Sequence, residues 1–329
     1  MKFRTDVSIT KPSWGIRHSD KLLLLGSCFA DNMGERLERA GFTSMVNPFG
    51  TLYNPASIAE VLTRLLDERL FSPEEMQPFG AEGWGSWVSH SLLSCPTKEQ
   101  ALELLNQRFK EAGQQLRRTD VLILTFGSAW VYRLMETDEI VANCHHEPSS
   151  RFVRERLEVN DIVALWRPLM ERLHALNPAM HILFTVSPIR HLRDGAHANQ
   201  LSKATLLLAM EALTASDKET AYFPAYEIML DELRDYRFYA DDMIHPSSMA
   251  IDYLWERFGD TFFDASTRVA AARIEEVTKA VGHRPLHPDS EDYRRFIRQT
   301  LLKIEDIQKE FPYFDAENLI DQCHTLLNN

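Results

Sequence analysis

The 329-residue sequence has few cysteines, no long apolar run and a shortage of positive charge. Its cysteines lie far apart, which argues against the disulfide framework of small secreted proteins and predicts reduced thiols. They are Cys28, Cys95, Cys144 and Cys323. The longest aliphatic run near the start, residues 22–25, is far below the roughly 20 residues of a membrane span. No apolar signal-peptide region follows residues 1–6, so we expect a cytoplasmic protein with no membrane partner.

The charge balance excludes one class of partner. The formal net charge of −12 repels phosphate backbones, and no basic block interleaved with aromatic residues offsets it locally. We therefore expect no nucleic-acid partner. The mixture of apolar and charged residues is that of a globular protein, and the length favours one large domain with an appendage.

Short apolar runs alternate with helical patterns over most of the chain. The run at 21–25 ends at Gly26 and is followed by helical spacing over 29–40, which is typical of a strand, a tight turn and a helix. Further predicted strands, each preceded by a helical pattern, are 121–126, 181–186 and 221–226, and the preceding helices are 98–117, 160–176 and 199–214. This alternation predicts a parallel sheet in a three-layer α/β/α sandwich, with function at the carboxyl ends of the strands.

The pattern changes after residue 264. Helices are predicted over 268–280, 289–309 and 315–327, with no strand between them. We therefore divide the chain into a main α/β domain, residues 1–264, and a C-terminal helical extension, residues 265–329.

The turn after the first strand presents two nucleophilic side chains. Gly26 lets the chain turn sharply, so Ser27 and Cys28 stand at the amino end of a helix. The free amides and the positive dipole end there favour a thiolate at Cys28 and a negative oxygen on a reacting acyl group. In the alternative interpretation Ser27 caps the helix and Cys28 is a buried apolar residue.

A second candidate lies far along the chain. Asp242 precedes His245 by three residues, close enough to bind one imidazole nitrogen and leave the other as a base. In the alternative, Asp242 or Ser247 caps a helix and His245 only packs.

Five segments, taken in order, carry a resemblance. The chain resembles the GSCFA family, which is related to the SGNH (GDSL-type) hydrolases, over roughly residues 20–260. The matching segments are Gly-Ser-Cys-Phe-Ala at 26–30, Asn-Pro-Phe-Gly-Thr at 47–51, Phe-Gly-Ser-Ala-Trp-Val-Tyr at 126–132, Ser-Pro-Ile-Arg-His at 187–191 and Asp-Met-Ile-His-Pro at 242–246. The resemblance implies a flavodoxin-like sheet and acyl-ester hydrolase or acyltransferase chemistry at its carboxyl edge.

The resemblance also implies roles for the first motif. SGNH enzymes have Gly-Asp-Ser there, with serine as the nucleophile, so the register places Ser27 on the aspartate and Cys28 on the nucleophile. A cysteine performs the same acyl transfer through a thioester and needs less activation than a hydroxyl. We favour Cys28, and Ser27 stays an alternative because a one-residue change in the turn would exchange the two side chains.

The oxyanion donors of this family match only in part. Gly50 matches the glycine of the second motif, whereas Ala129 stands where SGNH enzymes have a donating asparagine. The loss of such a donor costs on the order of 10²-fold in rate unless another group replaces it. Other candidates for oxyanion or substrate contacts are Gly127, Ser128, Asn143 and the Cys28 amide.

Arg190 and His191 follow a predicted strand and are expected at the same edge as Cys28. Arg190 either binds a carboxylate or phosphate of the substrate or forms a loop salt bridge with Asp194.

A zinc site is the weakest alternative. Suitable donor types occur at Cys144, His145, His146, His191, Asp194 and His197. Adjacent histidines do not easily face one ion from a strand, and no Cys-x-x-Cys pair is present, so histidines that face solvent or substrate are favoured. We predict no metal and no cofactor.

Together these residues predict a hydrolase or acyltransferase for a small-molecule or glycan acyl ester, with Cys28 or Ser27, His245 and Asp242 as the reacting groups. Carbohydrate esters enter by superfamily analogy only. The alternatives are a catalytically silent binding protein of the same fold and a zinc-dependent enzyme. The acyl group, its acceptor and the oligomeric state do not follow from the sequence.

Overall fold

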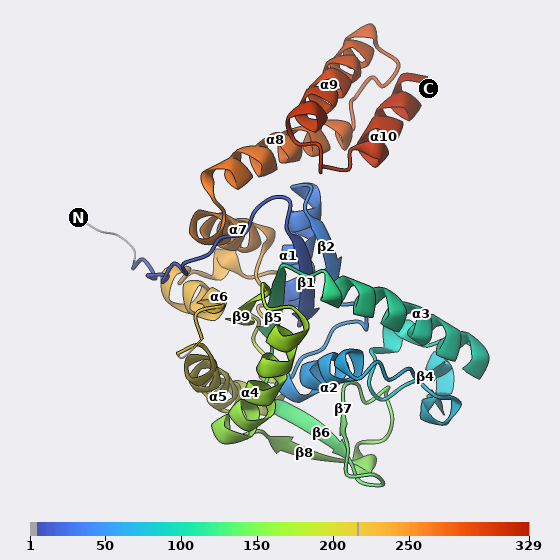
Figure 1. Ribbon diagram of the computed structural model, residues 1–329, viewed down its shortest axis with the longest axis vertical. Helices are drawn as coiled ribbons and strands as arrows, with labels where there is room; N and C mark the ends of the chain where they lie inside the picture. The colour runs from blue at the N-terminus through green and yellow to red at the C-terminus, as the bar shows by residue number, and fades with distance from the viewer. Residues whose placement is uncertain (1–4, 216, 329) are drawn as a thin grey trace.

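A five-stranded parallel sheet forms the centre of the molecule (Figure 1). The computed structural model describes residues 5–215 and 217–328. The strand order is β10-β9-β5-β1-β2, which confirms the expected parallel α/β architecture. The strands are β1 (Lys21–Gly26), β2 (Thr43–Val46), β5 (Val121–Phe126), β9 (His181–Val186) and β10 (Thr220–Phe223).

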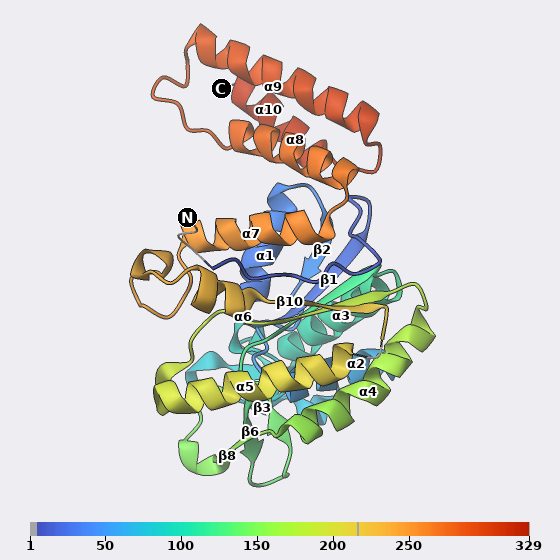
Figure 2. The same ribbon diagram turned by 90° about the vertical axis from the view of Figure 1, so that its left-hand side faces the viewer.

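Helices cover both faces of this sheet, as Figure 2 shows. Successive strand residues point to opposite faces, so Leu23 and Leu25 pack beneath α2 to α5 while Leu22 and Leu24 pack beneath α1 and α7. The three layers are therefore helix, sheet and helix. The helices are α1 (Cys28–Arg39), α2 (Pro55–Leu66), α3 (Lys98–Arg117), α4 (Val159–Leu176), α5 (Gly195–Thr214) and α7 (Ser248–Phe262).

One local expectation was wrong. The strand predicted at 221–226 ends at Phe223, because Pro224 has no amide to continue the ladder and the chain turns into α6 (Ala225–Glu227) and a π-helix (Ile228–Glu232). Helix α4 begins with Glu158 as its N-cap residue, in a reciprocal capping box with Asp161.

The residue pattern did not predict β2 or the short antiparallel strands. A three-stranded sheet has the order β7-β6-β8, and β3 pairs with β4. Their bounds are β3 (Gln77–Pro78), β4 (Trp84–Gly85), β6 (Trp130–Leu134), β7 (Ile140–Val141) and β8 (Phe152–Arg156). These strands are short or partly exposed, so they lack the continuous apolar run that identifies β5 and β9.

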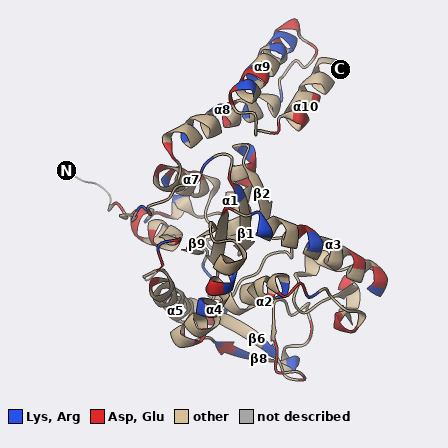
Figure 3. Cartoon of the chain, in the orientation of Figure 1, with Lys and Arg blue, Asp and Glu red and all other residues tan. Residues whose placement is uncertain are grey.

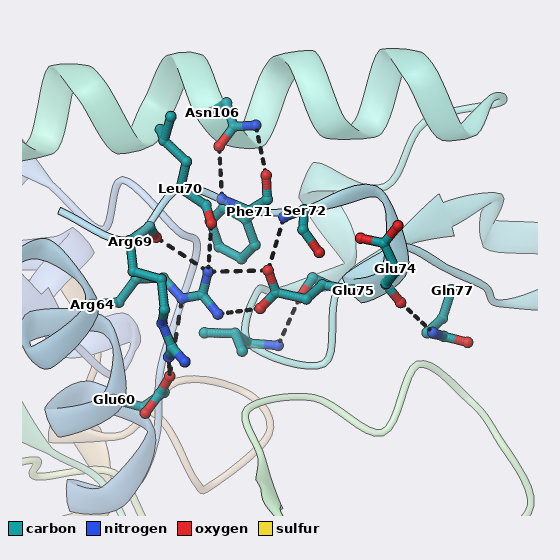
Figure 4. Close-up of polar contacts among 12 residues, drawn as sticks. Glu60, Arg64, Arg69, Leu70, Phe71, Ser72, Glu74, Glu75, Gln77 and Asn106 are labelled. Carbon is teal, nitrogen blue, oxygen red and sulfur yellow. Dashed lines mark hydrogen bonds and ion pairs between the residues drawn. The ribbon is translucent and has the colours of Figure 1, made fainter. Parts of the chain in front are cut away.

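The segment between α2 and α3 is anchored by a buried arginine (Figure 4). The guanidinium of Arg64 pairs with Glu75, donates to the carbonyl of Arg69 (3.2 Å) and lies 4.3 Å from the ring centre of Phe71. Asn106 of α3 holds the other side of the segment through both backbone groups of Phe71 (2.8 and 3.0 Å). Short 3₁₀ helices follow at Pro73–Glu75, Gly80–Glu82 and Ser91–Leu93. The anchored segment carries His90, which lies at the site described below.

Three helices at the C-terminus have a core of their own and stand at one end of the molecule in Figure 1. They are α8 (Ala265–Val281), α9 (Glu291–Glu310) and α10 (Glu317–Asn328). Asp264, the last residue of the proposed main domain, is the N-cap of α8. The amide of His18 donates to Thr267 Oγ1 (2.9 Å) and links α8 to the main domain. We propose residues 265–329 as the separate helical extension.

Acidic and basic residues are spread over the outer helices, whereas β5 and β9 contain none (Figure 3). Across residues 5–215 and 217–328, every helix falls short of the length or the apolar character that crossing a bilayer requires.

Candidate active site

The turn after β1 requires glycine. Gly26 has φ = 148°, and a Cβ there would lie 2.2 Å from the carbonyl oxygen of Thr125 on the neighbouring strand. Its amide donates to Asn47 Oδ1 (2.8 Å), which fixes the turn from the other side. The next two residues therefore emerge at the carboxyl edge of the sheet.

The two candidate nucleophiles of this turn have different surroundings. Ser27 is fully buried, and its hydroxyl accepts a long hydrogen bond from the amide of Phe29 (3.4 Å) as the N-cap of α1. Cys28 is partly exposed, and its Sγ lies 3.7 Å from Nε2 of His245. The structure thus brings the side chain of Cys28, rather than that of Ser27, to the histidine.

The loop before α7 fixes the imidazole. Asp242 Oδ2 lies 2.6 Å from Nδ1 of His245, and Oδ1 accepts hydrogen bonds from the amides of Ile244 and His245 (2.9 Å each). These contacts, the backbone amides first, lower the pKa of Asp242 to about 2, so the carboxylate is charged at neutral pH. With Nδ1–H donating to that carboxylate, Nε2 is the acceptor that faces the thiol. Ser247, not Asp242, caps α7.

The charge state of Cys28 differs from the expectation. Burial raises the pKa of the Cys28 thiol, and the nearby Asp31 carboxylate raises it further. The amides at the start of α1 and the Lys203 ammonium act in the opposite direction but do not outweigh burial. The helix N-terminus alone therefore does not produce a resting thiolate, and a base is needed to remove the proton.

Asp31 is part of a polar network that the sequence analysis did not identify. Its carboxylate accepts hydrogen bonds from Asn47 Nδ2 (2.7 Å) and Thr51 Oγ1 (3.3 Å). Asn47 thereby joins the turn at Gly26 to the first helix through opposite ends of one amide group. Asn47 and Thr51 of the Asn-Pro-Phe-Gly-Thr segment thus hold it against the turn and helix that carry Cys28.

Three of the backbone amides considered as oxyanion donors are already engaged. The Gly50 amide donates to Asn47 (2.8 Å), and the amides of Gly127 and Ser128 both donate to the carbonyl of Tyr53 (2.8 and 2.9 Å). These three amides therefore hold the loops in place. Ala129 is buried, and its amide donates to Ser202 Oγ (2.8 Å).

Two other amides flank the turn. Those of Cys28 and Thr51 have no hydrogen-bond partner in the described parts of the chain. Thr51 is held beside α1 by its hydroxyl contact to Asp31, and the next amide, that of Leu52, donates to the carbonyl of Gly26 (2.9 Å). Both free amides thus belong to segments next to the Cys28 side chain.

Gly50 has a different role, because its lack of a side chain leaves room for His90. It has φ = 78°, and a Cβ there would lie 2.3 Å from Cβ of His90. The His90 amide donates to the carbonyl of Phe49 (3.0 Å), and its Nδ1 accepts from the amide of Leu92 (3.2 Å). Burial lowers the pKa of His90, while the Asp31 carboxylate opposes that shift. His90 is therefore a second imidazole near the site, contributed by the segment that Arg64 anchors.

Lys203 of α5 is the charged group that sequence reasoning missed most clearly. It is buried, and its Nζ donates to the carbonyls of Gly127 (2.6 Å) and Ser187 (2.7 Å), which follow β5 and β9. Burial lowers the pKa of Lys203 to about 7, and the Cys28 thiolate acts in the opposite direction. The signal was a lysine on the face of a helix that otherwise packs on the sheet, with Leu206 and Met210.

His191 lies at the same edge, as expected. Burial, with the positive charge of Lys203 and the nearby His245, lowers the pKa of His191 to about 4, so the ring is neutral at physiological pH. It meets Tyr53 edge-on at 5.9 Å between ring centres. Its Nε2 is buried without a hydrogen-bond partner among the residues described.

The neighbouring Arg190 does not form the salt bridge that was considered. Its amide donates to the carbonyl of Ile244 (3.4 Å), and its Nε donates to the hydroxyl of Tyr239 (3.4 Å). Asp194 pairs with Arg154 instead. Arg190 therefore borders the loop that carries His245.

The zinc-type donors are arranged differently from the expectation. His145 and His146 lie in a turn with positive φ (47° and 57°), not on a strand. His145 is buried between Glu82 (2.9 Å) and the carbonyl of Ser86 (3.0 Å), so the view that it faces solvent or substrate was wrong. Asn143 Oδ1 accepts from the His145 amide (2.7 Å) within this turn. Over the described residues, no three His, Cys, Asp or Glu side chains converge as metal ligands would.

Comparison with known families gives two matches. The model of the "GSCFA family" matches residues 21–258, and that of "GSCFA domain protein, C-terminal domain" matches residues 274–329. No curated protein matches the sequence.

Solved structures whose backbone resembles that of this chain include three esterases. A carbohydrate esterase of family 3 from Talaromyces cellulolyticus is 10% identical, with a TM-score of 0.35 over 73% of this chain and 95% of its own. An acetyl xylan esterase from the rumen bacterium Butyrivibrio proteoclasticus is 12% identical, with a TM-score of 0.39 over 74% of this chain and 63% of its own. An acetyl esterase variant determined with an acetate ion is 10% identical, with a TM-score of 0.35 over 78% of this chain and 99% of its own. At these scores the likeness is too distant to carry an argument about this chain.

Proposed function

Because the chain belongs to the GSCFA family, we propose that it is an SGNH-type acyl-ester hydrolase or acyltransferase in which Cys28 is the nucleophile. The observation that supports this most is the contact series from Cys28 Sγ to His245 Nε2 (3.7 Å) and from His245 Nδ1 to Asp242 (2.6 Å). Nucleophile, base and orienting carboxylate stand in the order that acyl transfer requires.

The first half of the reaction forms a thioester. Nε2 of His245 accepts the thiol proton as Sγ of Cys28 bonds to the ester carbonyl carbon. The tetrahedral intermediate then collapses, the carbon–oxygen bond to the alcohol breaks, and the imidazolium returns its proton to the departing oxygen. Asp242 keeps its charge throughout and stabilises the imidazolium.

The second half releases the acyl group. Water or an acceptor hydroxyl gives its proton to His245 Nε2 as its oxygen bonds to the thioester carbonyl carbon. The carbon–sulfur bond then breaks, and the imidazolium returns the proton to the sulfur of Cys28. The side chain of His245 is 46% exposed, which gives either acceptor a route to the base.

We assign the oxyanion contacts to the free amides of Cys28 and Thr51. They take the place of the missing asparagine side chain at Ala129, while the amides of Gly50, Gly127 and Ser128 keep the loops in position. Lys203, which bonds the carbonyls of Gly127 and Ser187, holds the ends of β5 and β9 together beneath the site.

Ser27 is a helix cap in this proposal. A fully buried hydroxyl that accepts from the Phe29 amide stabilises α1 and supports its neighbour without reacting. The reaction takes place in the cytoplasm, where the four cysteines, which are all free, stay reduced. The first substrates to test are acetyl esters of sugars and of simple phenols.

Hydrolysis of 4-nitrophenyl acetate by purified variants tests this function. We expect Cys28→Ala to lose enzymatic turnover and His245→Ala to lose about 10²-fold or more in kcat/KM. Cys144→Ala is the matched control, since burial raises the pKa of that thiol to about 11. Turnover by Cys28→Ala at the wild-type rate would overturn the proposal.

A further inference from the structure

A hollow lies beside the loop that carries His245. Its volume is about 520 Å³, and it is bounded by the loop after β9, the π-helix and the segment before His245. The residues that matter most for its chemistry are Arg190, Met229, Leu233, Tyr236, Tyr239 and Met243. None of them has a role in the acyl-transfer steps.

This hollow, which we call the Arg190 pocket, shares a wall with the candidate active site. Met243 follows Asp242 directly, and the amide of Arg190 donates to the carbonyl of Ile244 (3.4 Å), the residue before His245. The Ala240 amide in turn donates to the carbonyl of His245 (2.8 Å). A group held in the pocket therefore lies beside the backbone of the loop that carries the imidazole.

Arg190 supplies an unneutralised positive charge to this pocket. Its guanidinium contacts the hydroxyl of Tyr239 (3.4 Å) and lies 5.8 Å from the centre of that ring. No carboxylate of the described residues pairs with it. Asp194 is taken by Arg154, and Asp235 at the pocket rim is taken by Arg237. Such a guanidinium has donors left for a planar or tetrahedral anion.

The rest of the lining is apolar or aromatic. Met229 and Leu233 are buried at the base, and the ring of Tyr236 stands exposed at the rim, where it offers a flat face. An occupant that suits this lining has a ring or short apolar body that ends in an anionic group.

We propose that the Arg190 pocket binds the alcohol part of the ester substrate through an anionic group, a carboxylate or a phosphate, held by Arg190. This inference rests on the proposed ester chemistry and narrows its substrates to acyl esters of anionic alcohols or phenols. Tyr236 and Tyr239 cover the body of that alcohol while the acyl carbonyl faces Cys28.

Matched substrates test the pocket. The probes are 4-acetoxybenzoate, its neutral counterpart 4-acetoxybenzamide and 4-acetoxyphenyl phosphate, with each rate divided by that of the uncatalysed reaction. We expect kcat/KM of wild type to be about 10-fold higher for at least one anionic ester than for the neutral amide. The anionic ester with the larger preference shows whether the pocket binds a carboxylate or a phosphate. A ratio taken within one variant cancels any general loss of activity.

Arg190→Gln should bring the ratio of kcat/KM for the anionic ester to that for the neutral ester close to one. Arg193→Gln should leave this ratio unchanged. Arg193 is the matched control, because it is an exposed arginine of the same loop that packs over Tyr132 instead of lining the pocket. No preference in wild type, or a preference that survives in Arg190→Gln, would overturn the inference.

A binding measurement separates this inference from the proposed reaction. Calorimetry with 4-hydroxybenzoate and 4-hydroxyphenyl phosphate against 4-hydroxybenzamide, on Cys28→Ala, needs no turnover. At least one anionic alcohol should bind about 10-fold tighter than the amide, and Arg190→Gln in the same background should abolish the difference. Equal binding of all three refutes the pocket alone. Failure of Cys28 to be acylated by 4-nitrophenyl acetate refutes the reaction, whatever the calorimetry shows.

Discussion

Nε2 of His245 lies 3.7 Å from Sγ of Cys28, although 217 positions separate the two residues in the sequence. A thiol donor and an unprotonated nitrogen at this distance are suited to direct proton transfer once a substrate is present. Burial and Asp31 keep the resting thiol protonated, so a base must remove its proton before the sulfur attacks. Activity should therefore depend on the histidine more strongly than in an enzyme with a preformed thiolate.

Ser27→Ala separates the two candidate nucleophiles. Loss of the cap should lower the free energy of unfolding by about 1 kcal/mol, because the Phe29 amide loses its acceptor. Acylation should stay on Cys28, and most of the turnover should survive. Urea denaturation and peptide mapping measure the two effects, and a loss of acylation in folded Ser27→Ala would instead favour Ser27 as the nucleophile.

The pH dependence of Cys28 alkylation reports its surroundings. Because burial and the Asp31 carboxylate raise the pKa of Cys28, its reaction with iodoacetamide should reach half its maximal rate above the value of about 8.5 for a free cysteine. Asp31→Asn removes the negative charge and should move that midpoint to lower pH. A midpoint that stays in place or rises would contradict the electrostatic role of Asp31.

Lys203→Met tests the buried ammonium. Without a donor for the carbonyls of Gly127 and Ser187, the free energy of unfolding should fall by about 2 kcal/mol or more. Lys279→Met is the control, because that lysine is exposed and its loss should cost little.

The stability of wild type should also depend on pH through Lys203. Its pKa is about 7 in the fold and about 10.4 in the unfolded chain, so between these values the unfolded state binds more protons. The free energy of unfolding of wild type should therefore increase relative to Lys203→Met as the pH rises from 7 towards 10. Denaturation curves for both proteins at several pH values measure this difference, and a constant difference would contradict the lowered pKa.

Asp242→Asn tests the orientation of the imidazole. The variant loses the charge that fixes Nδ1–H and stabilises the imidazolium, so kcat should fall by about 10²-fold or more with little change in KM. The pKa of Asp242 is about 2, so its own titration should not appear in activity profiles above pH 4. Asp241→Asn, an exposed neighbour, is the matched control. Equal activity of the two variants would show that Asp242 does not orient His245.

The central sheet was predictable because its strands are buried on both faces. Residues 121–126 and 181–186 are continuous apolar runs, and the structure places β5 and β9 over these ranges. By contrast, β8 contains Arg154, Glu155 and Arg156, and it is a strand only because Trp130 to Leu134 of β6 pair with it. Tertiary pairing of this kind leaves no periodic signal in a single sequence.

The candidate site was predictable in its reacting groups but not in their support. The tight turn predicted the position of Cys28, and the three-residue spacing predicted the contact between Asp242 and His245. The pairing of Cys28 with His245 was implied by the resemblance to the GSCFA family. The Gly50 amide bonds to the carbonyl of Asn47 because both residues have positive φ in this turn. The residue types alone do not reveal this contact. The burial of Lys203 depends on carbonyls from two distant strands.

The most direct test of the account is the site of the covalent intermediate. Wild type and His245→Ala are mixed with 4-nitrophenyl acetate, quenched in acid at short times and mapped by peptide mass spectrometry. The account predicts an acetyl thioester on Cys28 that hydroxylamine removes and that forms about 10²-fold or more slowly in His245→Ala. An acetyl group on Ser27, or no acetyl group on either residue while ligand still binds, would contradict it.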